Sequence, residues 1–398
     1  MTYLARARQR IPSGTQTYSK SHTRFPAGAP EYIVRAEGAY VYDASGQPWL
    51  DCVSGLGSVI LGHADPEVNA AARKQLLNGV AYPLPSLLEL SLAERICQLI
   101  PSAQMVRFGK NGADACEAAV RIARAVTGRE QVVSIGYHGY HDWTIAHQNP
   151  RGVPRASGEM LTVVPYGDLP AMAETVLAAM PACLIMEPIV ATNPVPPPDG
   201  YLEAVRDLCT QTGTILIFDE VVTFGRMKGF SAQAHYGVTP DLTALGKCLA
   251  NGLPLSAVCG RADLMRSLEE GVFFSTTFGG ETVSLAAAIA TLDTLVRERI
   301  DRRLDGLGRR CIATWLDAVR DAGLGDRVTL LGYPSRLVWQ WTDPEDAKLF
   351  GEALIGHRVL CAGYVNFTAA FHEGEMAQLE RAVRAGCEVV TMRERAAA

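Results

Sequence analysis

Apolar and polar positions alternate with two different periods along the chain. Residues 32–54, YIVRAEGAYVYDASGQPWLDCVS, alternate at every second position around an ASGQ turn, which predicts antiparallel strands. From about residue 66 onward, short apolar runs rich in Val, Ile or Leu alternate with amphipathic stretches of helical period. The runs are QVVSIGY, ACLIMEP, TILIFDE and SAVCGR, and the helical stretches include DACEAAVRIARAV and GYLEAVRDLCTQTG.

Strands that are apolar throughout and alternate with helices predict a mostly parallel sheet covered on both faces. A long Ala-rich helix, ETVSLAAAIATLDTLVRER, comes next, and residues 300–398 have the pattern of a mixed α+β unit with strands SRLVWQWT and VLCAG. We therefore predict an α/β protein in which a large domain is flanked by two pieces of a smaller one. The expected segments are an N-terminal arm with part of the small domain (1–56), the large domain (57–290) and the C-terminal small domain (291–398).

Composition narrows the functional class. The 398 residues are 48% hydrophobic and 20% charged, ordinary values for a folded protein. The net charge of −5 gives no electrostatic reason to expect nucleic acid or an anionic membrane as partner. The apolar runs are shorter than the roughly 20 residues that span a bilayer. The first residues lack the apolar core of a signal peptide. Ten scattered cysteines without CxxC spacing indicate reduced thiols, so a cytoplasmic protein is expected.

Polar residues follow the apolar runs, at the strand ends where open α/β sheets bind ligands. TILIFDE ends in Asp219 and Glu220. ACLIMEP has Glu187 before its final Pro, and QVVSIGY ends in Tyr137, which His138 follows. A carboxylate that follows five apolar residues is costly to bury unless a cationic group meets it. Asp219 therefore predicts a cationic partner at this edge of the sheet.

Lys247 is unusual because the chain uses Arg for most of its cations. Only six of the 37 basic residues are Lys, namely Lys20, Lys74, Lys110, Lys228, Lys247 and Lys348. An amine can lose its proton and attack a carbonyl, which a guanidinium cannot do. Lys247 is therefore a candidate nucleophile.

The segment FGKNGADACEAAVRIAR places small residues, Gly112 and Ala113 after Asn111, at the start of a helix. Backbone N–H groups and the helix dipole favour a phosphate at such a position. Together with a flat ring against Tyr137, a cationic ring atom for Asp219 and a carbonyl for Lys247, these features describe pyridoxal 5'-phosphate.

Three stretches resemble the class III pyridoxal-phosphate aminotransferases, above all the glutamate-1-semialdehyde aminomutase-like branch. They are IFDEVVTFGR, HYGVTPDLTALGKCLANGLPLSAVCGR and TTFGGETVSLAAAIATLDTL, and the likeness covers nearly the whole chain. Lys247 stands 28 residues after Asp219. The resemblance implies a fold-type I transferase and a homodimer with shared active sites. In it, Lys247 would form the Schiff base and act as general base, and Asp219 would pair with the pyridine nitrogen.

The same resemblance assigns further residues to the cofactor. Tyr137 and Val221 would cover the two ring faces, and Thr277 would reach the phosphate of the partner subunit. Asn111, Gly112 and Ala113 occupy the phosphate cradle, where the family usually has Ser-Gly-Thr, and His138 and Glu187 would lie beside the cofactor. The segment DEVVTFGR also departs from the family, since it lacks the Gly after Thr.

The arm segment IPSGTQTYSK aligns with the aminomutases' GGVNSPVR, so Lys20 stands where they have a substrate-facing Arg. Lys offers a mobile point charge instead of a planar fork for a carboxylate. Tyr18 and Glu281 are candidate partners for substrate hydroxyl groups. We therefore expect an amino donor, glutamate or glutamine, and an acceptor that is a hydroxylated cyclic or sugar-like ketone.

Parts of the sequence are also compatible with other classes of function. A glutamate-1-semialdehyde-type aminomutase or a racemase would use every cofactor residue named above, and the sequence leaves them open. A nicotinamide-dependent oxidoreductase predicts a G-x-G-x-x-G fingerprint, and SGLGSVILG has a different spacing. His138 and His141 have H-x-x-H spacing without further ligands of supporting spacing, so no metal is expected.

Overall fold

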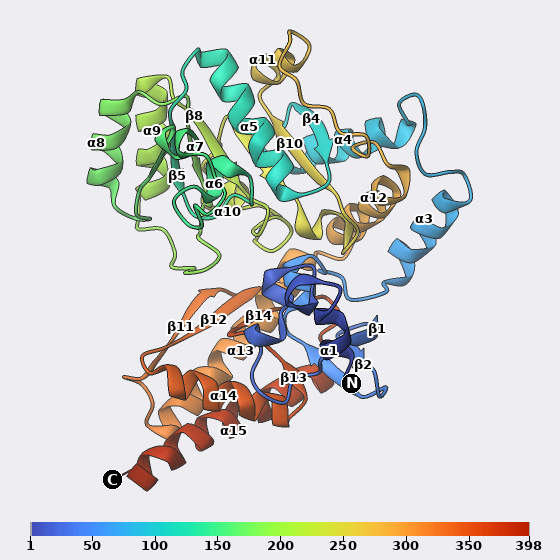
Figure 1. Ribbon diagram of the computed structural model, residues 1–398, viewed down its shortest axis with the longest axis vertical. Helices are drawn as coiled ribbons and strands as arrows, with labels where there is room; N and C mark the ends of the chain where they lie inside the picture. The colour runs from blue at the N-terminus through green and yellow to red at the C-terminus, as the bar shows by residue number, and fades with distance from the viewer. Residues whose placement is uncertain (1, 398) are drawn as a thin grey trace. The chain divides into compact units, whose positions relative to one another are not determined.

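The sheet predicted for the middle of the chain forms the centre of one of two units (Figure 1). The computed structural model describes residues 2–397, with side chains as far as Arg393. The larger unit is Pro66–Asp301, and the smaller combines the chain up to Asp65 with the chain from Arg302 onward. The larger unit therefore begins and ends about ten residues after the expected 57 and 290, because it includes the whole of α12 (Thr282–Arg297), which packs against α3 (Pro66–Leu76).

Within the described residues, the sheet of the larger unit has the strand order β4-β10-β9-β8-β7-β5-β6. The strands are β4 (Met105–Gly109), β5 (Val132–Ile135), β6 (Leu161–Val163), β7 (Cys183–Met186), β8 (Ile215–Asp219), β9 (Leu242–Leu245) and β10 (Ser256–Gly260). Neighbours from β9 to β6 pair in parallel, whereas β10 runs antiparallel to both β4 and β9. The predicted mostly parallel sheet is confirmed.

Both faces of this sheet are covered by helices. Ile215 and Ile217 of β8 pack in one apolar cluster with residues of α5. Leu216 and Phe218 pack in a second cluster with residues of α8 and α9 on the opposite face. Because successive strand residues point to opposite faces, a sheet buried on both sides requires strands that are apolar throughout. This explains the apolar runs of the sequence.

The helices of the larger unit follow the strands in the expected alternation. They are α3, α4 (Leu87–Leu99), α5 (Gly112–Thr127), α6 (Asp142–Ile145), α7 (Arg155–Glu159), α8 (Leu169–Ala179), α9 (Tyr201–Thr212), α10 (Ala232–Tyr236), α11 (Ala262–Met265) and α12, with 3₁₀ turns η4 (Lys247–Ala250) and η5 (Arg266–Leu268). The Ala-rich helix α12 packs against α3, α4 and η4, so it supports the turn that carries Lys247.

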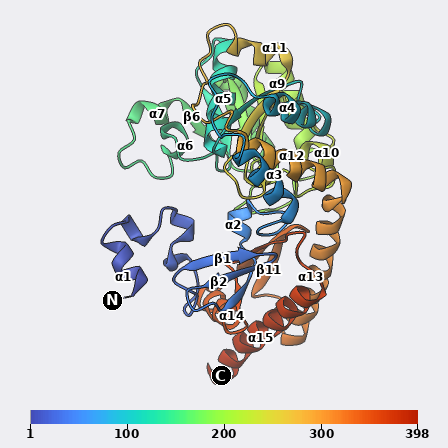
Figure 2. The same ribbon diagram turned by 90° about the vertical axis from the view of Figure 1, so that its right-hand side faces the viewer.

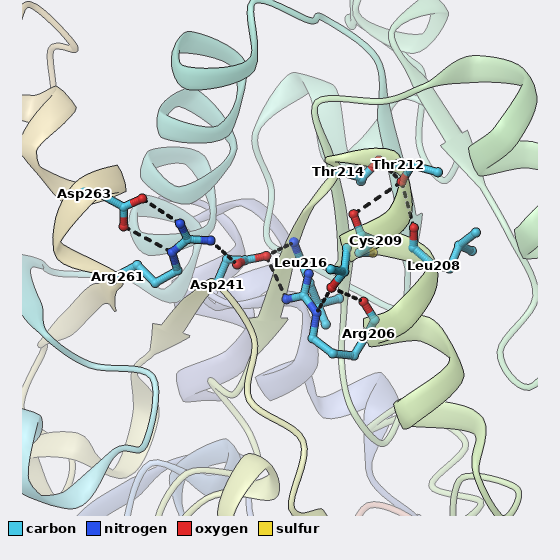
Figure 3. A network of polar contacts seen from close by, with 10 residues as sticks. Arg206, Leu208, Cys209, Thr212, Thr214, Leu216, Asp241, Arg261 and Asp263 are labelled. Carbon is cyan, nitrogen blue, oxygen red and sulfur yellow. Dashed lines mark hydrogen bonds and ion pairs between the residues drawn. The ribbon is translucent and has the colours of Figure 1, made fainter.

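A buried carboxylate lies at the N-terminal end of the parallel strands (Figure 3). Asp241 accepts hydrogen bonds from Arg206 at 2.8 Å, from Arg261 at 2.9 Å and from the Leu216 backbone N–H at 2.8 Å. Its side chain is only 8% exposed, so these donors offset its loss of hydration. Arg261 also pairs with the exposed Asp263. The network joins α9, β8 and β9 at the edge of the sheet opposite the polar strand ends predicted as the ligand site.

The smaller unit contains two sheets and long helices. The antiparallel strands β1 (Ile33–Glu37), β2 (Tyr40–Asp43) and β3 (Pro48–Asp51) agree with the pattern of residues 32–54, and β13 (Val359–Leu360) joins β3 in parallel. The second sheet has the order β11 (Val328–Tyr333), β12 (Arg336–Trp341) and β14 (Tyr364–Asn366). The remaining helices are α2 (Ser54–Gly57), α13 (Ile300–Ala322), α14 (Pro344–Gly356) and α15 (Glu373–Ala397).

The first residues of the smaller unit form an arm of short turns beside β1 and β2 (Figure 2). It consists of α1 (Tyr3–Arg8) and the 3₁₀ turns η1 (Pro12–Gly14), η2 (Tyr18–Lys20) and η3 (His22–Arg24). The Tyr32 hydroxyl donates to the Gly14 carbonyl at 2.7 Å, which ties the arm to the start of β1. In the part of the chain that the structure describes, no helix has the length and apolar character needed to cross a membrane.

Candidate active site

The chemically active residues come together at the C-terminal ends of the parallel strands. The pairings Ile135↔Met186 and Met186↔Phe218 align the ends of β5, β7 and β8, and Asp219 itself pairs with Ala244 of β9. Tyr137 and His138 follow β5, Glu187 follows β7, Asp219 ends β8 and Lys247 follows β9. Because all four strands run in the same direction, these side chains share one edge of the sheet, as the sequence predicted.

Asp219 is a buried carboxylate with three protein donors. Its Oδ2 atom lies 2.8 Å from Nδ1 of His138 and accepts a hydrogen bond from Sγ of Cys116 at 3.4 Å. Its Oδ1 atom accepts the Val221 backbone N–H at 3.0 Å. The side chains of His138 and Asp219 are 1% and 5% exposed. These contacts hold the carboxylate in one orientation and leave it able to meet a cationic group.

His138, which contacts Asp219 through Nδ1, has a second ring nitrogen, Nε2. Its Nε2 atom is buried and has no hydrogen-bond partner in the structure, although buried polar atoms are almost always satisfied. The ligand atoms of Cys116, His138 and Asp219 lie within 4.8 Å of one another, which is also a possible set of metal ligands. Since Asp219 already bonds to both neighbours at hydrogen-bond distance, we read the group as a network that orients this carboxylate.

Glu187 lies deep in the same edge and is 4% exposed. It accepts the backbone N–H groups of Tyr137 at 3.0 Å and Ala191 at 3.3 Å. Burial, together with the negative charge of Asp219, raises the pKa of Glu187 to about 7. The charges of His138 and Lys247 act in the opposite direction, which places Lys247 within electrostatic range of Glu187. Burial beside a second carboxyl group therefore makes Glu187 a weaker acid than a carboxyl group in water.

Gly136 provides the space for Glu187. Its φ is +102°, and a Cβ atom there would lie 2.5 Å from Oε2 of Glu187. Gly139 has a φ of +110°, and its Cβ would lie 2.5 Å from Cβ of Ala113. Both positions need glycine for its backbone conformation and for lack of room. The turn after β5 is thereby pressed against Glu187 on one side and against the start of α5 on the other.

The start of α5 forms a narrow cradle with the loops after β8 and β9. A Cβ atom on Gly112 would lie 2.8 Å from the methyl groups of Val221. A Cβ atom on Gly246 would lie 3.6 Å from the Cα of Gly112, so the residue before Lys247 lies against the helix start. The Asp114 carboxylate accepts the Lys110 and Asn111 N–H groups, each at 2.8 Å. The first N–H groups of a helix have no intrahelical acceptor, which suits an anion.

Lys247 has a strained backbone. Its φ of +46° is left-handed, although the residue is not glycine. Such a conformation costs on the order of 1–3 kcal/mol and is found mainly at functional sites. Gly246 and Cys248 on either side are buried, whereas Lys247 is half-buried. The Cys248 thiol donates to the Phe224 carbonyl at 2.8 Å and anchors the turn.

Thr277 and Glu281, which the sequence predicts to bind phosphate and substrate, lie in a region of the larger unit other than the strand ends described above. Thr277 is exposed and lines a cavity of about 610 Å³ between the loop 81–85 and the segment 274–281. Glu281 also lines it and begins α12, where its Oε1 accepts the Val283 N–H at 2.7 Å. Oε2 of Glu281 pairs with Nζ of Lys110 at 3.0 Å. The phosphate role of Thr277 and the substrate role of Glu281 stay predictions.

Tyr137, Tyr18 and Lys20 are all accessible side chains. Tyr137 is 51% exposed beside His138, so its ring is open to a flat ligand. Tyr18 is 75% exposed in the arm of the other unit, and Lys20 is exposed in the same 3₁₀ turn. Their contacts with cofactor or substrate stay predictions.

The sequence did not point to Cys116, Gly136 or Lys110. Cys116 follows Gly112 by four residues, so helical spacing places both on one face, and this signal was readable. Glu220, next to Asp219, has a different task, because it accepts from Thr223 at 2.8 Å and from the Gln233 side chain at 3.0 Å, and so fixes the start of α10.

Comparisons with known proteins show the family of the chain and agree with its fold. Residues 25–321 match the sequence model of the Aminotransferase class-III family. The glutamate-1-semialdehyde 2,1-aminomutase of Methanothrix thermoacetophila is 39% identical over 312 residues, 75% of this chain and 72% of that protein. The aminomutase of Methanocella arvoryzae is 36% identical over 80% of this chain and 82% of that protein. An omega-transaminase from Sphaerobacter thermophilus superposes with a TM-score of 0.90, 28% identity and coverage of 98% and 97%.

The fold is therefore that of a fold-type I pyridoxal-phosphate enzyme. More narrowly, the chain belongs to the class III aminotransferase family, and pyridoxal 5'-phosphate is its cofactor. The residues present fit this group. The buried Asp219 suits a protonated pyridine nitrogen, the cradle at Gly112 has no room for a side chain, and Nε2 of His138 lacks a partner. When bound, the cofactor supplies an electron sink for the substrate carbon.

Glu187 makes the stability of the cofactor-free enzyme depend on pH. Folding raises the pKa of Glu187 from 4.5 to about 7. The protonated carboxyl therefore stabilises the folded protein in full below about pH 4.5, and this stabilisation is lost as the pH rises to about 7. We predict that wild type loses about 2–3 kcal/mol relative to Glu187→Gln across this window, since each pKa unit is worth about 1.4 kcal/mol. Urea unfolding at several pH values measures this difference. The exposed Glu174→Gln variant should follow wild type, and parallel profiles for wild type and Glu187→Gln would contradict the prediction.

Proposed function

We propose that this enzyme transfers an amino group from glutamate or glutamine to the carbonyl carbon of a hydroxylated cyclic or sugar-like ketone. Lys20 carries the acceptor part of the proposal. It stands where the aminomutase pattern has a substrate-facing Arg, and its side chain is exposed. A single ammonium cannot grip a carboxylate with two parallel hydrogen bonds, but it suits hydroxyl and carbonyl oxygens.

The proposed chemistry uses the residues at the sheet edge. Lys247 holds the cofactor covalently and, when displaced by the amino donor, takes the proton from the α-carbon of the donor. The same amine delivers a proton to the carbonyl carbon of the acceptor in the second half of the reaction. Asp219, oriented by His138 and Cys116, keeps the pyridine nitrogen protonated, and Glu187 limits the negative charge beside it.

A second copy of the chain is the proposed partner of the larger unit. Large apolar side chains are exposed in the segments around the cavity that Thr277 lines and in the residues that flank these segments in the chain. Leu84 and Leu90 line the cavity itself, and the flanking residues are Leu76, Leu77, Leu87, Phe273 and Phe278. An apolar surface of this kind is unfavourable in water and typical of a subunit interface. We propose a homodimer in which Thr277 completes the partner's phosphate site. Its ten free thiols, nine of them buried, favour the cytoplasm as the compartment.

An aminomutase is the second candidate, because two relatives at 39% and 36% identity are glutamate-1-semialdehyde 2,1-aminomutases. That reaction needs no second substrate, since the amino group returns to a neighbouring carbon of the same molecule. The choice between the two functions therefore depends on whether turnover requires a separate keto acceptor.

The covalent role of Lys247 can be tested directly. We expect purified holoenzyme to be yellow, and borohydride reduction followed by peptide mapping to find the cofactor on Lys247. Lys247→Ala should lower turnover by about 10³-fold or more because the general base is lost. Lys228→Ala removes an exposed lysine of the same unit and should leave colour and turnover unchanged. A label on another lysine would refute the assignment.

Shared sites in a homodimer predict complementation between two inactive variants. Lys247→Ala and Thr277→Ala should each be nearly inactive alone. In heterodimers one of the two sites then has both an intact Lys247 and an intact partner Thr277. Activity should rise after subunit exchange, toward about a quarter of wild type for random pairing. Exchange confirmed by differently tagged subunits without any rise would place Thr277 in its own subunit's site.

The identity of the acceptor can be determined by assaying a panel of candidate carbonyl substrates with one amino donor. With glutamate as donor, we expect a hydroxylated cyclic or sugar-like ketone to have kcat/KM at least tenfold above that of pyruvate or glutamate-1-semialdehyde. Lys20→Arg should shift this ratio toward carboxylate-bearing acceptors. Faster conversion of glutamate-1-semialdehyde than of any ketone, without added donor, would instead establish the aminomutase.

A further inference from the structure

The N-terminal arm concentrates positive charge. Residues 1–24 contain five basic side chains and no carboxylate, whereas the whole chain has a net charge of −5, so the remaining residues carry −10. The five are Arg6, Arg8, Arg10, Lys20 and Arg24, and all are exposed. Such a difference in charge within one chain points to an anionic partner for the arm.

Within the described part of the chain, the side chains of these cations have no carboxylate partner. Among the described residues, none of the five forms an ion pair with a carboxylate. Arg8 contacts a base, with Nη2 lying 2.6 Å from Nε2 of His22. By comparison, Arg95 pairs with Asp293 at 2.8 Å and Arg297 with Glu67 at 2.7 Å. The arm thus carries five exposed cations without a carboxylate partner among the described residues.

The arm has a defined conformation that keeps these charges in place. The Thr2 hydroxyl caps α1 by accepting the Ala5 N–H at 3.2 Å, and the Leu4 N–H donates to Glu31 at 3.3 Å. Gly14, with a φ of +74°, receives the Tyr32 hydroxyl on its carbonyl. Figure 2 shows the resulting series of turns beside β1 and β2. Holding repelling charges in such a fold is a cost that a bound anion would remove.

An aromatic ring lies among the charges. Tyr18 is 75% exposed, and the guanidinium of Arg24 lies 5.3 Å from its ring centroid. Lys20 is in the same 3₁₀ turn as Tyr18. An exposed ring offers a stacking surface for a base, and Lys and Arg bind phosphate oxygens. The combination fits a nucleotide better than a bare sugar or a simple carboxylate.

We propose that the arm recognises the phosphate groups of a nucleotide-linked acceptor, so that the keto-sugar of the proposed function is presented as a nucleoside diphosphate sugar. The inference rests on that proposed function for the sugar, and on the arm's own charges for the nucleotide. A polyanion such as nucleic acid fits less well, because the rest of the chain carries −10 and would repel it.

Binding of nucleotides to the full-length holoenzyme tests this without turnover. The probes are UDP, GDP and dTDP, each with its monophosphate and nucleoside, in isothermal titration at low salt. We expect at least one diphosphate to bind at least fivefold more tightly than its monophosphate, and more weakly as salt is added. The Lys20→Gln/Arg24→Gln variant should weaken diphosphate binding at least tenfold, and Tyr18→Ala should weaken both nucleotides. Arg73→Gln, an exposed site on α3, is the charge-matched control and should bind like wild type.

The outcomes separate this inference from the proposed function. Diphosphate binding that depends on the arm supports the inference even if no keto-sugar is aminated, a result that would refute only the proposed acceptor. No diphosphate affinity below about 1 mM, or affinity unchanged in both arm variants, would overturn the inference. Tighter arm-dependent binding of a single-stranded oligonucleotide or of phosphatidylglycerol vesicles would also overturn it, in favour of a polymer or a membrane.

Discussion

The charge of Asp219 at the end of β8 is the constraint on which the site depends. A carboxylate that is 4% exposed survives only with strong hydrogen bonds or a nearby cation. The protein supplies His138, Cys116 and one backbone N–H. In the proposed site, the protonated ring nitrogen of the cofactor would complete this compensation, and the buried acid would in turn keep the ring protonated.

Glu187 shows how the site tolerates a second carboxyl group. Two ionised carboxylates in one buried place would repel each other, and a pKa of about 7 leaves about half of the Glu187 carboxyl groups protonated at pH 7. Gly136 makes this contact possible, since any side chain there would collide with the Glu187 oxygen. The strained backbone of Lys247 and the left-handed Gly136 and Gly139 all lie at the same sheet edge. The apolar clusters on both faces of the sheet supply the stability that supports this strain.

The residues proposed for the cofactor and those proposed for the substrate in the arm belong to different units. Asp219, His138, Glu187 and Lys247 all lie in the larger unit, and the family match rests on this part of the chain together with part of the smaller one. The arm, with its exposed Tyr18 and unpaired cations, belongs to the smaller unit. An aminotransferase and an aminomutase can share the first set completely, so differences in substrate are expected to depend on the second.

The sequence by itself determined the class of fold and the chemistry. Apolar runs identified β5, β7, β8 and β10, because a sheet buried on both faces needs apolar residues at successive positions. Asp219 and Lys247 after apolar runs, with Tyr137 and the small residues at the start of α5, indicated the cofactor, and the family resemblance added the spacing of Asp219 and Lys247. The sequence pattern did not identify β4, β6 or β9 as strands. The pattern also gave no sign that β10 runs antiparallel, because strand direction depends on neighbours far away in the chain.

Only the tertiary structure decided which residues surround Asp219. Cys116 lies 103 residues and His138 81 residues from Asp219 in the chain. Their contacts with Asp219 therefore follow from the packing of α5 against the sheet and from the place of β5 within it. The elevated pKa of Glu187 and the left-handed conformation of Lys247 likewise arise from burial and packing. The local sequence determines which side chains are present at each strand end. The distances between these side chains are set by the order of the strands and by the helices that cover the sheet.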